Sequence, residues 1–115
     1  MIQIGINIAV KGAEVLSIPP IAVPALVTPP FLSGLPILGQ VLSCTSGVWT
    51  NNPTSYSYQW YRDPFPGGNQ QAILGAVNST YTVTPSDLNC FIICEVGATN
   101  IIGTNYAYSN QIFVI

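Results

Sequence analysis

The sequence predicts an all-β fold, an antiparallel β-sandwich of about seven short strands preceded by an extended N-terminal arm. Several short segments alternate apolar and polar residues with a period of two, which is typical of strands with one buried face. Turn residues separate these segments at intervals of about 8–12 residues, and no segment of useful length has the helical period. A chain of 115 residues has room for one such domain.

The N-terminal arm, residues 1–18, begins with the clearest alternation in the chain. Its apolar positions are Ile2, Ile4, Ile6, Ile8 and Val10, and the residues between them are Gln3, Gly5, Asn7 and Ala9. Lys11-Gly12 is the expected turn or bend. No basic residue precedes Lys11 and no Ala-x-Ala site follows, so we expect a chain made in the cytoplasm from Met1 and no signal peptide.

Residues 19–30 separate the arm from the following domain with five prolines, Pro19, Pro20, Pro24, Pro29 and Pro30. Prolines remove backbone donors and prevent a helix, so this segment is either a stiff spacer or an irregular first strand. They also interrupt any continuous pairing between the arm and the domain behind it. Because an exposed apolar strand is an aggregation hazard, we expect the arm to add to the sheet of another protein.

Residues 31–115 supply the strands of the domain in a regular order. Strands are expected within residues 39–47, 55–63, 70–76, 79–83, 90–99 and 105–115, with turns at 51–54, at 64–69 and around Gly103. In the second of these segments Tyr56, Tyr58 and Trp60 share one face. Tyr58 and Trp60 are therefore expected in the core.

The composition excludes several classes of function. Charged residues make up 5% of the chain, the formal net charge is −2 and the mean hydropathy is +0.46. The two cations, Lys11 and Arg62, are too few to neutralise a phosphate backbone, so we expect no nucleic-acid partner. No apolar run approaches the roughly 20 residues of a membrane helix, so we expect no membrane span.

The sequence also lacks the residues that most catalytic sites need. There is no histidine to activate a serine or cysteine, and the four carboxylates fall on different elements: Glu14, Asp63, Asp87 and Glu95. Gly67-Gly68 has no following lysine or helix and is expected to be a hairpin turn. The three cysteines have neither a histidine nor a CxxC pair beside them, so we expect no enzyme, no cofactor and no metal site.

Three segments carry a family resemblance: "GQVLSCTSGVWTNNPTSYSYQWYRD", "AILGAVNSTYTVTPSDLN" and "CEVGATNIIGT". Together they resemble the immunoglobulin-like repeats of tailed-phage structural proteins and bacterial surface proteins, over roughly residues 27–115. The resemblance implies an immunoglobulin-like sandwich, here given the bounds 31–115. The arm lies outside the resemblance.

The resemblance assigns a structural role to Cys44, Cys94 and Trp60, which match the Cys…Trp…Cys core of immunoglobulin domains. It leaves open whether the two cysteines form a disulfide or stay as buried thiols. Cys90 is expected to be a structural thiol. Two residues depart from the family pattern, because Asn89 replaces a usual glycine and Phe91 lacks the hydroxyl of a tyrosine corner.

The function implied by the resemblance is a non-enzymatic virion protein, made in the host bacterial cytoplasm. The first expectation is a capsid decoration or stabilising protein whose arm binds other capsid or tail subunits, and the second is a tail or neck accessory. An adhesion module that binds host-surface glycans is the alternative from another class. Its expected contact is Tyr61, which alternation places on the outer face of its strand.

Overall fold

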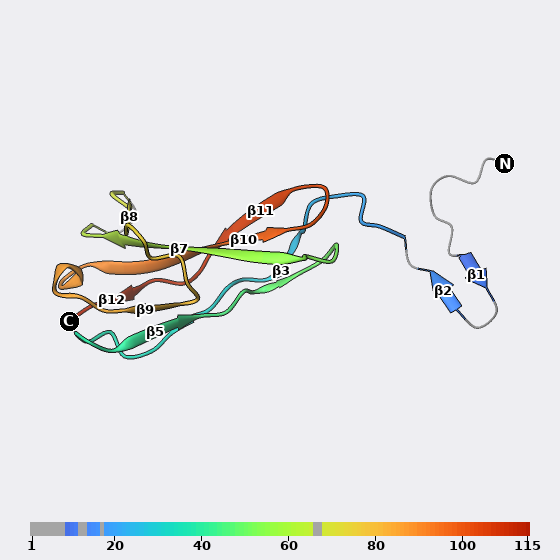
Figure 1. Cartoon of the computed structure of the whole chain (residues 1–115). Helices are drawn as coiled ribbons and strands as arrows, with labels where there is room; N and C mark the ends of the chain where they lie inside the picture. Colours follow the sequence, from blue (N-terminus) through green and yellow to red (C-terminus); the bar gives the residue numbers. More distant parts are fainter. Residues whose placement is uncertain (1–8, 12–13, 17, 66–67) are drawn as a thin grey trace.

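The computed structural model describes residues 9–11, 14–16, 18–65 and 68–115, and it is an all-β protein with antiparallel sheets (Figure 1). Its strands are β1 (Ala9–Lys11), β2 (Glu14–Leu16), β3 (Leu26–Thr28), β4 (Leu32–Ser33), β5 (Val41–Cys44), β6 (Val48–Trp49), β7 (Ser55–Asp63), β8 (Gln71–Ala72), β9 (Thr80–Thr82), β10 (Phe91–Thr99), β11 (Thr104–Tyr108) and β12 (Ile112–Phe113). A 3₁₀ turn, Pro85–Asp87, lies between β9 and β10.

The larger layer is a sheet with the strand order β11-β10-β7-β8, and β12 pairs with the other end of β10. β7 and β10 are its two long strands and pair over nine positions, from Asp63 opposite Phe91 to Ser55 opposite Thr99. β8 is shorter than the expected strand at 70–76. After Ala72 the chain turns away, and Ala76 accepts a hydrogen bond from the backbone of Trp60 (3.0 Å).

The second layer is formed by β4-β5-β9 and by the pair β3-β6. β3 falls within the proline-rich segment 19–30, so that segment contains an irregular first strand. The two parts are joined where the backbone N–H of Thr45 donates to the carbonyl of Phe31 (3.0 Å). The β3–β6 pair has a register shift between Leu26 and Thr28. Beside it, the φ of +75° at Gly47 and its close approach to the Thr28 carbonyl leave no room for a side chain.

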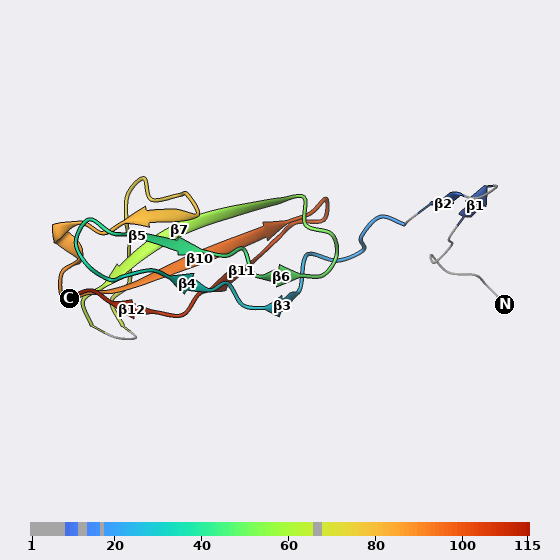
Figure 2. The ribbon, with the colours of Figure 1, turned by 90° about the horizontal axis from the view of Figure 1, so that it is seen from below.

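The core lies between these two layers, giving a sandwich-like arrangement (Figure 2). Alternate residues of both layers point into it, as the period of two requires. The buried cluster consists of Leu32, Leu42, Cys44, Trp60, Tyr81, Val83, Ile92, Cys94, Val96 and Val114.

The expected last strand at 105–115 is interrupted, and its single-strand prediction is wrong. β11 pairs with Glu95–Thr99 and β12 with Phe91–Ile92, with residues 109–111 between them. There the Ser109 hydroxyl accepts the backbone N–H of Cys94 (3.0 Å). The Asn110 side chain accepts from the N–H of Leu32 (2.8 Å) and donates to its carbonyl (3.0 Å), so it replaces a backbone partner for β4.

β1 and β2 form a separate antiparallel hairpin, with Val10 opposite Val15 and Lys11 opposite Glu14. Gly12, the second residue of the bend expected at Lys11-Gly12, lies outside the described residues. In both views the hairpin lies apart from the two layers, connected to them by residues 18–25 (Figures 1 and 2). Ile2, Ile4, Ile6 and Ile8 lie outside the described residues.

Candidate functional site

Cys44, Cys94 and Trp60 lie together in the core, with Trp60 directly opposite Cys94 in the β7–β10 register. Both cysteines are free thiols. Contact with Cys44, together with burial, raises the pKa of Cys94 well above the ordinary value, so this thiol stays protonated. The Trp60 ring stacks on Tyr81 (centroids 5.5 Å apart), and its indole N–H donates to the Asn78 carbonyl (2.7 Å). The contact with Cys94 lowers the pKa of Cys44, although burial acts against this. Both thiols are buried and pack within the core.

Cys90 is also buried, and its Sγ lies 3.6 Å from the carbonyl oxygen of Leu88. Among the described residues no three His, Cys, Asp or Glu side chains are grouped as a metal ion would require. No helix in the described part of the chain is long and apolar enough to cross a membrane.

The corner before β10 is held by a polar cluster that we call the corner network: Arg62, Tyr81, Thr84 and Asp87. Asp87 is fully buried and accepts hydrogen bonds from all three partners. Its carboxylate receives Arg62 Nε at 2.6 Å, the Tyr81 hydroxyl at 2.6 Å, the Thr84 N–H at 2.8 Å and the Thr84 hydroxyl at 3.1 Å. Burial acts against the charged guanidinium, but the hydrogen bond and the charge of Asp87 raise the pKa of Arg62.

Asp87 and its partners thus hold this corner, and the side chain at position 91 has no hydroxyl to add to them. Phe91 instead packs on Phe113, with ring centroids 5.0 Å apart. Asn89 has a φ of +62°, which explains why glycine suits this position, and its N–H donates to the Val114 carbonyl (3.0 Å). The Asp87 and Asn89 interactions together fix the turn into β10.

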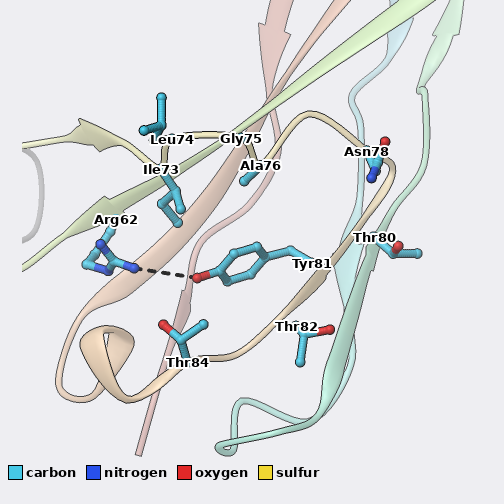
Figure 3. A pocket seen from close by; sticks show the side chains of 10 residues that line it. All are labelled: Arg62, Ile73, Leu74, Gly75, Ala76, Asn78, Thr80, Tyr81, Thr82 and Thr84. Carbon is cyan, nitrogen blue, oxygen red and sulfur yellow. Dashed lines mark hydrogen bonds between the residues drawn. The ribbon is translucent and has the colours of Figure 1, made fainter.

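A hollow of about 460 Å³ lies beside the corner network. It is lined by Arg62, Ile73, Leu74, Gly75, Ala76, Asn78, Thr80, Tyr81, Thr82 and Thr84. Figure 3 shows Arg62 and Tyr81 directed toward each other, while Leu74 points away. Arg62 already donates to Asp87 and to the Tyr81 hydroxyl (3.5 Å), so its positive charge is paired with the Asp87 carboxylate.

Tyr61, the predicted glycan contact, is half-buried. Its hydroxyl donates to Glu95 Oε1 (3.0 Å), and its ring meets Tyr108 edge-on (centroids 6.0 Å apart). Burial, the hydrogen bond to Glu95 and the charge of Glu95 raise the pKa of Tyr61 to about 12. Burial and the same carboxylate raise the pKa of Tyr108.

Two tyrosine rings of β11, on the same side of the larger sheet as Tyr61, are more exposed: Tyr106 (59%) and Tyr108 (46%). The sequence pattern alone does not connect either ring with Glu95. Alternation within 104–108 places both rings on one side, whereas their register with β10 is a long-range property.

Of the predicted arm residues, Val10 lies in β1, and the four isoleucines at positions 2, 4, 6 and 8 lie outside the described residues. Of the predicted row of apolar arm residues, the structure therefore describes only the last one, Val10. Comparison with known proteins adds no assignment, because no protein-family model and no curated protein matches the chain.

Proposed function

We propose that this chain is a non-enzymatic structural protein of a tailed-phage particle, a capsid decoration or stabilising protein with an immunoglobulin-like domain. The arm carries the proposal, because its alternating apolar residues precede a sandwich that is already complete. The arm then joins a neighbouring capsid or tail subunit, and the domain lies on the outside.

The strand arrangement supports the immunoglobulin-like assignment. One layer holds β3 and β4 with β5, β6 and β9, and the other holds β8, β7 and β10 with β11 and β12. The first and last parts of the domain thus lie in different layers, as they do in seven-strand immunoglobulin domains. The Cys44, Trp60 and Cys94 cluster occupies the centre of the core, as the resemblance implies.

The hairpin supports the anchoring role. A two-stranded sheet of three residues per strand is marginal by itself in water. β1 and β2 lie apart from the sandwich, so the layers of the domain do not cover them (Figure 1). Addition to a neighbour's sheet would give this hairpin further backbone hydrogen bonds.

The composition is consistent with a protein that works inside an assembly. Because only 5% of the residues in the chain are charged, charge repulsion gives the surface little protection against association. Exposed apolar side chains occur at both ends of the domain, including Ile21, Ile101 and Ile115. Fixed placement in a particle removes the solubility demand that a free protein would face.

The test is incorporation of full-length variants into particles. Ile4→Lys with Ile6→Lys places charges on the apolar side of the arm, and Gln3→Lys with Asn7→Lys is the matched control on its other side. We expect the first pair to abolish co-sedimentation with particles while the control retains it, with unchanged circular dichroism for both. Normal incorporation of the Ile4→Lys, Ile6→Lys variant would refute the anchoring role.

A chain lacking residues 1–18 provides a second test. It is expected to be absent from purified particles when the full-length chain is detected there by mass spectrometry. The copy number per particle distinguishes capsid decoration, which needs many copies, from a tail or neck accessory, which needs few.

A further inference from the structure

The outer side of the larger sheet presents a group of side chains that we call the tyrosine face: Tyr61, Glu95, Gly97, Tyr106 and Tyr108. Directly opposed residues of an antiparallel sheet share a side, and the register places Tyr108 opposite Glu95 and Tyr106 opposite Gly97. The intervening Val96 is fully buried in the core. The tyrosine face is therefore the side of β7, β10 and β11 that points away from the other layer.

Tyr106 lies over Gly97, in a position that only glycine leaves open. A β-carbon on Gly97 would approach Cε1 of the Tyr106 ring to 2.9 Å and the Ser57 hydroxyl to 2.5 Å. Gly97 is buried beneath these groups, while Tyr106 is 59% exposed. The ring thus rests on the sheet and offers its remaining surface to solvent.

The neighbouring polar groups are held in place before any ligand arrives. The Tyr61 hydroxyl donates to Glu95, and the Tyr61 ring meets Tyr108 edge-on. On the other side of Tyr106, the hydroxyl oxygens of Thr99 and Thr104 are 2.7 Å apart. A site whose side chains are already ordered loses less entropy on binding.

We propose that the tyrosine face binds a pyranose glycan that carries no acidic group. A pyranose has an apolar face of C–H bonds and a rim of hydroxyls. Its C–H face suits the negative face of an exposed aromatic ring, and its hydroxyls suit nearby acceptors and donors. Tyr106 is the stacking surface, and Glu95 with the threonine hydroxyls supplies the polar contacts.

Charge selects among glycans. Glu95 is the partly exposed charge on the tyrosine face; Asp63, at the far end of the same side of β7, is 2% exposed. Arg62 and Asp87 pair with each other in the corner network. An acidic sugar would meet a carboxylate that has no cation beside it among the described side chains, whereas a neutral or amine-bearing sugar would not be repelled. This role is separate from the arm and does not rest on the anchoring proposal.

The test is a titration of the full-length chain, followed by two-dimensional NMR, with four tetrasaccharides. Three are not acidic (N-acetylglucosamine, glucosamine and glucose tetramers), and the fourth is a galacturonic acid tetramer. We expect millimolar or tighter binding of at least one non-acidic tetramer, with shifts centred on Gly97 and Tyr106, and no binding of the acidic one. Absence of binding by all three at low millimolar concentration, or equal binding of the acidic tetramer, would overturn the proposal.

Variants identify the contact surface. Tyr106→Thr, a residue suited to exposed strands, is expected to weaken binding about tenfold, the equivalent of one aromatic contact. Gly97→Ala is expected to weaken binding by displacing the ring that it supports. Tyr106→Phe keeps the ring and retains most of the affinity. Tyr56→Thr is the matched control, because Tyr56 is 42% exposed but lies on the opposite side of β7, and its loss leaves binding unchanged.

Two results would assign the tyrosine face another role. If Tyr106→Thr lowers thermal stability but leaves glycan affinity unchanged, the ring only covers Gly97 and the proposal fails. If the wild-type chain self-associates in analytical ultracentrifugation, and Tyr106→Thr abolishes that association but not glycan binding, the face is an interface between copies of the chain. That result would also overturn the proposal.

Discussion

The Asp87→Asn substitution tests whether the corner network holds the domain together. The carboxylate is 0% exposed and is the shared acceptor for Arg62, Tyr81 and Thr84. The asparagine side chain has nearly the same shape, so it leaves no cavity. It replaces one acceptor oxygen with an NH₂ donor that faces other donors.

The expected loss follows from the donors that lose their partner. A buried donor left without an acceptor costs about 1–3 kcal/mol, and breaking a fully buried ion pair costs about 3–5 kcal/mol. Arg62 is 23% exposed, so water can solvate its guanidinium and the ion-pair contribution is smaller. We expect Asp87→Asn to lower the free energy of unfolding by about 3 kcal/mol, a large share of the 5–15 kcal/mol typical of a domain.

Urea denaturation of the full-length chain, monitored by the fluorescence of its two tryptophans, Trp49 and Trp60, measures this loss. Asp63→Asn is the matched control, because Asp63 is 2% exposed but, among the described residues, its side chain accepts one hydrogen bond, from the Phe65 N–H (2.8 Å). Its expected loss is about 1 kcal/mol or less. If Asp87→Asn costs no more than Asp63→Asn, the reasoning that the corner network fixes the turn into β10 is refuted.

Three further predictions concern single groups. Because Cys44, Cys90 and Cys94 are all buried, a thiol reagent should label none of them in the native chain and all three in urea; rapid native labelling would contradict this packing. The stabilisation from the Tyr61–Glu95 hydrogen bond should be fully present below about pH 10 and lost as the pH rises through about 12, where Tyr61 ionises. Tyr61→Phe should therefore make the free energy of unfolding depend less on pH in that range. An unchanged pH profile would contradict this role of Tyr61. Asn110→Ala should lower the free energy of unfolding in urea by about 1–3 kcal/mol, because both Leu32 hydrogen bonds are lost; a loss near zero would show that water replaces them.

The longest strands could be predicted closely from sequence. The segment expected at 55–63 is β7 with the same bounds, and the segment expected at 90–99 is β10 from Phe91 to Thr99. Alternation also placed Trp60 and Cys94 in the core correctly. These strands are predictable because a period of two is a local property that many successive residues repeat.

The interruption at residues 109–111 was not predictable from the same pattern. Its cause is the Asn110 side chain, which pairs with Leu32 across 78 positions of the chain. Alternation places Tyr61 on the side of its strand away from the core, but it does not give the neighbours of the ring. Glu95 and Tyr108 reach Tyr61 from two other strands.

The sequence by itself determined the strand periods, the turns, the polar and weakly charged surface, and the residues that face the core. All of these depend on residue type and on spacing along the chain. Only the tertiary structure decided that Asp87 gathers Arg62, Tyr81 and Thr84, and that Tyr106 rests on Gly97 beside Glu95. Those contacts depend on strand register and on the approach of distant segments, which the local pattern does not fix.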